Sequence, residues 1–136
     1  MNYNSGYVNG YKLEFTTHAK ERAVQRFKEL GIQLDDKGYI ELAEAGVYET
    51  LSNRFMSQYI NNFMMNRTDE TDVLVLDTTN KMVYAFNMKP MKSKLVVKTL
   101  GTTYNGKWEH HMYQRVCWIY PDTFKFTARN GNVTWY

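Results

Sequence analysis

Three residues near the N-terminus have the types and spacing needed for chemistry on a phosphate group. His18, Arg22 and Arg26 are four residues apart, so a helix would place them along one face. Histidine transfers protons near neutral pH, and the planar guanidinium group of arginine matches two phosphate oxygens. This face therefore offers one proton-transfer group and two groups that stabilise negative charge.

Such groups suit cleavage of an RNA strand through its own 2′-hydroxyl, which needs a base, an acid and cations. The second proton-transfer group must come from elsewhere, and His110 and His111 are candidates. Because adjacent side chains point in different directions, at most one of these two joins the site. Spacing alone favours a plainer interpretation, in which His18 caps the helix and the arginines pair with Glu21 or Glu29.

A second basic stretch follows in the C-terminal half, with aromatic residues between its lysines. It comprises Lys89, Lys92, Lys94, Lys98 and Lys107, with Tyr84, Phe86, Tyr104 and Trp108 interspersed. Cations for phosphates and rings for unstacked bases are typical of surfaces that bind single-stranded RNA. The sequence supports equally well a second interpretation, in which these lysines lie on a solvated sheet face and the aromatic residues belong to the core. With no cysteine cluster and no His/Glu pair at ligand spacing, we expect neither a metal site nor a cofactor.

A first helix must position the His18 face. Thr17 is its expected N-cap, and small or apolar residues recur at helical spacing until Gly31, which predicts a buried stripe. That stripe is Ala19, Ala23, Phe27 and Leu30. A short second helix is expected over residues 39–45, ending at Gly46, and a third from Val47 to about Met65, although a strand over 47–50 is an alternative.

The rest of the chain predicts strands. Short apolar runs lie at 11–15, 73–76, 82–86, 95–97, 115–120, 123–128 and 133–136, with turn residues between several of them. Helices followed by strands predict an α+β fold, with two or three N-terminal helices packed on an antiparallel sheet of about four to six strands. Residues 101–136 would form a C-terminal β extension of this fold.

Length and composition place the chain among small single-domain proteins. Its 136 residues are 43% hydrophobic and 15% aromatic, which predicts one domain over residues 1–136. Without a long apolar run or a signal-like N-terminus, we expect a soluble cytoplasmic protein that does not meet a membrane. The single cysteine, Cys117, lies in an apolar run and is expected to be an inert buried thiol. A net charge of +3 permits nucleic-acid binding without selecting it.

Residues 18–26, HAKERAVQR, resemble the His-x-x-Asp/Glu-Arg-Ala-Ile/Val-Gln-Arg helix of RegB-type phage endoribonucleases. More broadly, they resemble the His-Ala-x-x-Arg opening of RelE/BrnT-like toxins. The resemblance covers residues 11–100 in outline and implies a RelE-like core, with His18 as a catalytic imidazole and Arg22 on the phosphate. It also implies metal-free cleavage that leaves a 2′,3′-cyclic phosphate. Where the family has a second functional histidine, this chain has Glu44, which can act as a base but departs from the pattern.

The resulting hypothesis is an RNA-binding protein, and more specifically an endoribonuclease that cleaves mRNA, free or on the ribosome. It would act in the host cytoplasm if a phage encodes it. Two alternatives use the same fold without catalysis: an RNA-binding module and an inhibitor of a host protein. Exposed rings among lysines would favour RNA, whereas a contiguous apolar patch would favour a protein partner.

Overall fold

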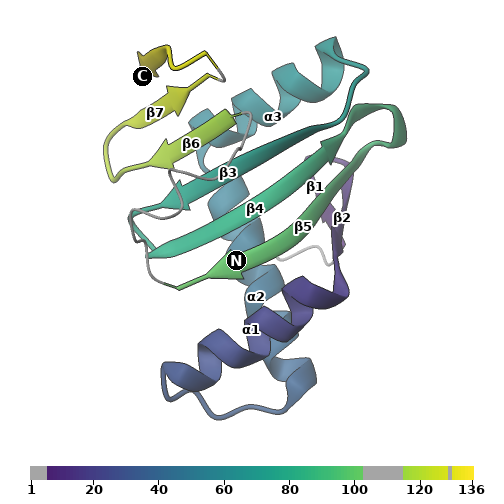
Figure 1. Cartoon of the computed structure of the whole chain (residues 1–136), viewed down its shortest axis with the longest axis vertical. Coiled ribbons are helices and arrows are strands. Elements are labelled where there is room, and N and C mark those ends of the chain that lie inside the picture. The colour runs from purple at the N-terminus through teal and green to yellow at the C-terminus, as the bar shows by residue number, and fades with distance from the viewer. Residues whose placement is uncertain (1–5, 103–114, 129) are drawn as a thin grey trace.

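One mixed sheet has three helices packed against it: two lie behind it in the view of Figure 1, and the first lies below it. The computed structural model describes residues 6–102, 115–128 and 130–136. The helices are α1 (Thr17–Glu29), α2 (Asp36–Leu51) and α3 (Arg54–Asn66), with a short 3-10 helix η1 (Pro90–Lys92). The strands are β1 (Tyr7–Val8), β2 (Tyr11–Phe15), β3 (Thr71–Asp77), β4 (Met82–Lys89), β5 (Lys94–Gly101), β6 (Arg115–Ile119), β7 (Phe124–Thr127) and β8 (Val133–Trp135).

The predicted α+β fold with helices packed on a sheet is confirmed, and the sheet itself is larger and more mixed than predicted. Its described strands follow the order β1-β2-β5-β4-β3-β6-β7-β8, eight rather than four to six. Two pairs, β2 with β5 and β3 with β6, are parallel rather than antiparallel. Tight turns reverse the chain and give antiparallel pairs, whereas a strand that returns after a long connection can enter in either direction. The C-terminal strands extend this same sheet at the β3 edge.

Side chains alternate between the two faces of the sheet and form two unequal clusters. The main core lies between the sheet and the helices, and it contains Val73 and Val75 of β3. Leu74 and Leu76 of the same strand point the other way and form a small cluster with Val83, Ala85, Val116 and Trp118. We call this second side, which faces away from the helices, the open face; the name means only that no described helix packs on it, because Leu74, Leu76, Val83 and Ala85 at its centre are at most 1% exposed.

The start of α1 is fastened to β5 where β2 ends. The N–H of Thr16 donates to the Val97 carbonyl (3.0 Å), and its hydroxyl donates to the Lys98 carbonyl (3.0 Å). The same hydroxyl accepts from the N–H of Ala19 (3.1 Å), so Thr16 rather than Thr17 is the N-cap. This residue therefore fixes the position of the helix that carries His18.

The predicted buried stripe of α1 is confirmed at three of its four positions. Ala19, Ala23 and Phe27 are buried against the sheet and α2, whereas Leu30 is 58% exposed. Leu30 is the C-cap, where the chain turns away through Gly31 at a positive φ of 83°. The departure of the backbone at the helix end therefore carries the Leu30 side chain off the core.

The boundary between the second and third helices differs from the prediction. The helix α2 continues through Gly46 to Leu51, and α3 begins at Arg54 rather than at Val47. The break lies at Asn53, whose side chain accepts hydrogen bonds from the first backbone N–H groups of α3. The N-cap residue Asn53, and not Gly46, therefore separates the two helices, so Gly46 has another role.

Gly46 allows α2 to approach the sheet closely. A Cβ atom at this position would lie 2.9 Å from the hydroxyl oxygen of Tyr84, a fully buried residue of β4. Such a contact is shorter than van der Waals distance, and the ring has no solvent into which it can move. The glycine is thus a packing residue within a helix rather than a helix stop.

We expect Gly46→Ala to destabilise the protein, because the clash costs ~1–3 kcal/mol and the gain in helix propensity is only ~1 kcal/mol. In a Tyr84→Phe background the hydroxyl is absent, so the same change should stabilise the protein by up to ~1 kcal/mol. Urea denaturation of the four variants measures the coupling between the positions. An equal effect of Gly46→Ala in both backgrounds would contradict the close approach.

The interior also holds the single cysteine. Cys117 is fully buried on the helix side of β6 and is a free thiol. Burial raises the pKa of this thiol, because the thiolate would lose its hydration. The prediction that this residue is buried is therefore confirmed.

Candidate nucleic-acid interface

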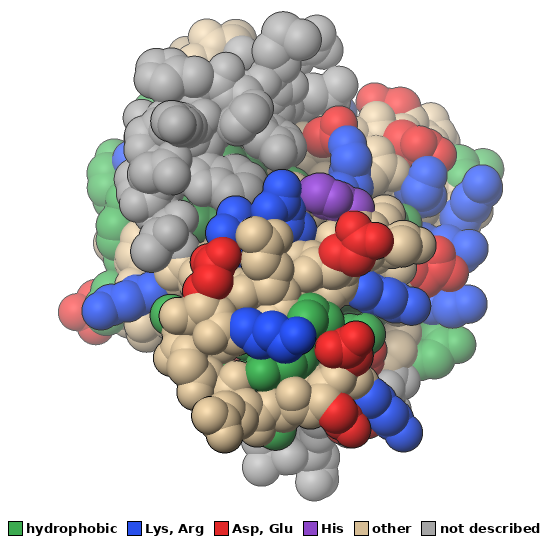
Figure 2. Space-filling model, turned by 60° about the horizontal axis from the view of Figure 1, so that its bottom comes forward, with side chains coloured by type: hydrophobic (Ala, Val, Ile, Leu, Met, Phe, Trp, Pro, Cys, Tyr) green, Lys and Arg blue, Asp and Glu red, His purple; other side chains and the backbone are tan. Residues whose placement is uncertain are grey.

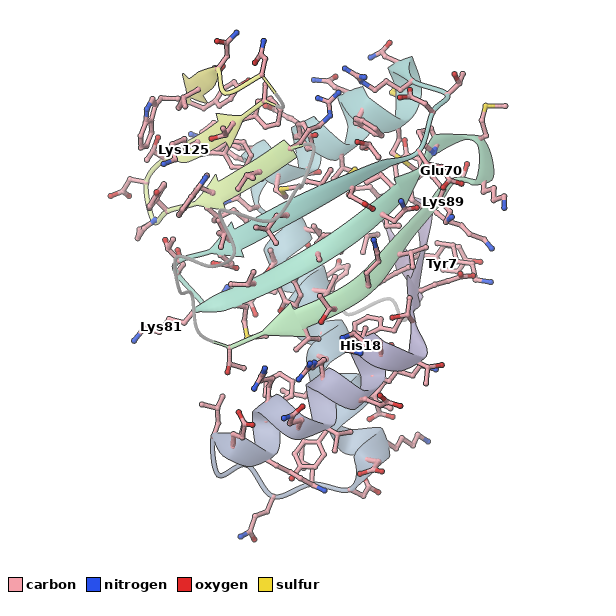
Figure 3. All side chains as sticks on the ribbon, viewed as in Figure 1. Tyr7, His18, Glu70, Lys81, Lys89 and Lys125 are labelled. Atoms are coloured by element: carbon pink, nitrogen blue, oxygen red, sulfur yellow. The ribbon has the colours of Figure 1, made fainter. Side chains whose placement is uncertain are left out.

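The structure brings His18 and Arg22 together on α1. The Nε of Arg22 lies 3.4 Å from Nε2 of His18, in a long hydrogen bond that needs a neutral imidazole to accept it. His18 is exposed, and Figure 3 places it on α1 near β5. The two residues thus present an imidazole and a guanidinium side by side at the surface.

The third member of the predicted face is engaged elsewhere. Arg26 forms an ion pair with Glu29 (3.1 Å), as the plainer interpretation of the spacing expects. Gln25 accepts a hydrogen bond from Arg22 (2.9 Å) and donates one to Glu29 (3.4 Å). Figure 2 shows acidic and basic side chains interspersed around the histidine, so this side of the molecule is of mixed charge.

Three of the predicted RNA-binding lysines form ion pairs. Lys89 pairs with Glu70 (3.2 Å), Lys94 with Glu14 (3.2 Å) and Lys98 with Asp72 (3.4 Å). Figure 3 shows Lys89 and Glu70 adjacent at one end of the sheet. Hydrogen bonds from Lys94 and then Lys12 lower the pKa of Glu14, so this carboxylate stays charged beside them. These carboxylates reduce the positive charge that β4 and β5 offer to phosphate.

The remaining predicted residues are spread over the chain. Lys92 lies exposed in η1, and Glu44 lies partly exposed on α2, which packs against α1. Tyr104, Lys107, His110 and His111 fall outside the described residues, as does Trp108. Of the predicted catalytic residues, the described part of the chain therefore brings only His18 and Arg22 into contact.

A row of rings lies at the other end of the sheet, where β6, β7 and β8 pair. The planes of Trp118 and Tyr120 differ by 4°, with centroids 6.4 Å apart. Those of Tyr120 and Trp135 differ by 23°, with centroids 5.9 Å apart. Trp135 is 59% exposed. These three residues, which we call the aromatic row, have rings in nearly parallel planes; Trp118 and Tyr120 are half-buried, and Trp135 is exposed.

A lysine lies within the aromatic row. Lys125 of β7 stands opposite both Trp118 and Trp135 in the strand register, and its Nζ is 4.2 Å and 5.3 Å from their ring centroids. Figure 3 shows Lys125 at the opposite end of the sheet from Tyr7. Within residues 6–102, 115–128 and 130–136, no carboxylate forms an ion pair with Lys125. The row therefore combines stacking surfaces with an ammonium group.

None of these residues is among the site residues predicted from the sequence. Their shared face follows from alternation, since Trp118 and Tyr120 are two apart on one strand. The turns at 121–122 and 130–131 fix the register that brings Lys125 and Trp135 beside them. Combining the three predicted C-terminal strands in this way would have located the row.

No protein-family model, curated protein or solved structure matches this chain. The resemblance of residues 18–26 to RegB-type endoribonucleases therefore stays a prediction. Among the described residues, no three His, Cys, Asp or Glu side chains gather closely enough to hold a metal ion. No described helix has both the length and the apolar character to cross a membrane.

Proposed function

We propose that the protein binds single-stranded RNA on the open face of its sheet, with bases stacked on the aromatic row. The observation that carries this proposal is the set of near-parallel rings of Trp118, Tyr120 and Trp135 around Lys125. Unpaired bases stack on aromatic side chains exposed on a sheet, and every base has a π-face for such contact. A nearby ammonium group meets the phosphate that follows each base.

The type of surface favours single strands over duplexes. Bases inside a duplex are already stacked on each other, so they cannot lie against Trp135 without being unpaired. A protein partner would instead need a contiguous apolar patch, whereas the row holds a charged Lys125 between its rings. Charge and ring geometry together therefore support a flexible polyanion as the ligand.

We expect a moderate dependence of RNA affinity on salt. Each neutralised phosphate of a single strand contributes a slope of about 0.7 to the log–log salt plot. Lys89, Lys94 and Lys98 already pair with carboxylates, so few phosphates gain a new partner. A slope on the order of 1 predicts a roughly fourfold loss of affinity between 50 and 200 mM salt.

The measurement is a fluorescence titration of the full chain with single-stranded and duplex RNA of the same sequence at several salt concentrations. Stacking on Trp135 should quench tryptophan emission with the single strand and much less with the duplex. Absence of binding at micromolar protein, or equal binding of the duplex, would contradict the proposal.

A second candidate function is metal-independent RNA cleavage, which the contact between His18 and Arg22 favours. The imidazole can take or give a proton while the neighbouring guanidinium stabilises charge on the phosphorus oxygens. Its test is incubation of RNA with the protein in excess chelator, followed by analysis of the ends. Fragments that carry 2′,3′-cyclic phosphates support it, and intact RNA with and without ribosomes would reject it.

A further inference from the structure

A pocket of about 300 Å³ lies between α3 and the C-terminal strands, on the side of β6 and β7 opposite the open face. Its walls are largely aromatic: Phe55, Tyr59 and Phe63 of α3 with Phe124 and Phe126 of β7. The volume falls at the small end of the range for small-molecule sites, ~300–1,000 Å³. The pocket is thus suited to a compact ligand with a flat apolar part.

Two guanidinium groups line the pocket beside these rings. The Cζ atoms of Arg67 and Arg115 lie 5.3 Å and 5.6 Å from the centroid of Phe63. No Asp or Glu is among the residues that line the pocket, and within the described ranges neither arginine forms an ion pair. Two like charges therefore converge on one cavity without a described counterion, which favours an anionic ligand.

Buried polar atoms in the same place lack partners. The Nε of Arg115 and the hydroxyl of Tyr59 are both buried and make no hydrogen bond among the described residues. Buried polar groups are nearly always hydrogen-bonded, so each unpaired one calls for a partner such as water or a ligand. Burial raises the pKa of Tyr59, so its hydroxyl stays protonated and can donate.

The remaining polar lining fits the edge of a base. Gln58 and Asn62 are four residues apart on α3, so their amides share one face of the helix and both border the pocket. A side-chain amide both donates and accepts hydrogen bonds. These amides therefore suit a nucleobase, whose edge carries donors and acceptors, better than they suit a ligand with a plain phenyl ring. The pocket thus provides cations, stacking walls and base-edge partners within one small volume.

We propose that this pocket binds a nucleoside monophosphate. The phosphate lies between Arg67 and Arg115, the base stacks against the aromatic walls, and Gln58 and Asn62 contact the base edge. The site is separate from the aromatic row, because Arg115 and Cys117 face the helix side of β6 whereas Val116 and Trp118 face the open side. Binding of the mononucleotide therefore does not depend on binding of RNA to the row.

The test is isothermal titration of the full chain with AMP, GMP, CMP and UMP, with inorganic phosphate and adenosine as truncated probes. At least one mononucleotide should bind, and adenosine and inorganic phosphate should each bind at least tenfold more weakly, because each lacks half of the contacts. No binding of any mononucleotide at millimolar concentration overturns the proposal. Equal binding of adenosine overturns the role of the arginines, and equal binding of phosphate overturns the role of the rings.

Arg67→Gln is the main variant, because Arg67 is exposed at the C-terminal end of α3 and its loss should spare folding. It should weaken mononucleotide binding by roughly 10- to 100-fold, the usual effect of removing a hydrogen-bonded charge. Arg54→Gln is the matched control, because Arg54 also lies over a ring, that of Phe55 (4.5 Å), but does not line the pocket. Equal losses in both variants would mean general charge attraction and would overturn the proposal.

The same variants separate this site from the RNA surface. Trp135→Ala should leave mononucleotide binding unchanged, and Arg67→Gln should leave the affinity for single-stranded RNA unchanged. Loss of both activities in Arg67→Gln while the protein keeps its melting temperature would show one shared site and overturn the separate pocket. In the wild type, a bound mononucleotide should raise the melting temperature in proportion to the logarithm of its concentration.

Discussion

Trp135→Ala is expected to weaken the binding of single-stranded RNA by roughly 5- to 150-fold, the effect of losing one base-stacking contact of about 1–3 kcal/mol. The ring is more than half exposed and lies at the free end of the aromatic row, so its loss removes ligand surface rather than core packing. Fluorescence anisotropy with a labelled oligonucleotide measures the change. Trp135→Phe keeps a ring and should retain most of the affinity.

Tyr7 provides the control for this variant. It is an exposed aromatic residue on β1, at the opposite end of the same sheet (Figure 3). Tyr7→Ala should leave RNA affinity unchanged, because no row of parallel rings surrounds this residue in the described part of the chain. If both variants lose affinity equally, binding is not located at the aromatic row.

His18→Ala is expected to lower the rate of RNA cleavage by roughly 10²- to 10⁴-fold, if cleavage occurs at α1, because it removes a general acid or base. RNA affinity should stay close to that of the wild type, since the aromatic row is intact. Arg22→Lys should also slow the reaction, because an ammonium group keeps the charge but loses the two-pronged contact with phosphate. Single-turnover cleavage of labelled RNA measures both rates.

Lys20→Ala is the matched control, since Lys20 is exposed on the same helix and makes no side-chain contact that the described structure records. It should cleave at the wild-type rate. A His18→Ala protein that cleaves as fast as the wild type would assign the activity to another site or to a contaminant. Only the proposed RNA binding would then remain, and the Trp135 variants test it.

Local sequence patterns predicted the helices and strands of this fold better than they predicted which of these elements pair or pack together. The stripe of Ala19, Ala23 and Phe27 follows from helical spacing, because a buried face repeats every three or four residues. Gly46 led to a wrong predicted end for the second helix. A glycine is needed there because the helix packs closely against the hydroxyl of Tyr84, which lies in a strand 38 positions later in the printed sequence. The two parallel pairings likewise depend on distant strands, which alternation within one strand does not specify.

In the candidate site too, contacts within one element were predictable from the sequence, and contacts between distant elements were not. The contact between His18 and Arg22 is local to one helix, and the four-residue spacing had placed both residues on one helical face. The ion pairs of Lys94 with Glu14 and of Lys98 with Asp72 join different strands, and no spacing rule reveals them. Arg67 and Arg115 meet at Phe63 only because β6 pairs with β3 at the end of α3, so this pocket required the tertiary structure.

The strand order sets a minimum length for any RNA that would reach from the aromatic row to His18. The helix that bears His18 borders β5, whereas Trp135 lies on β8, and the order β5-β4-β3-β6-β7-β8 separates them by five steps. At ~4.8 Å for each step, the span is on the order of 24 Å. A dinucleotide stacked on the aromatic row would be too short to reach the imidazole. An RNA strand held by the row would have to extend over at least this distance before His18 could act on it, so cleavage would need a longer substrate than binding.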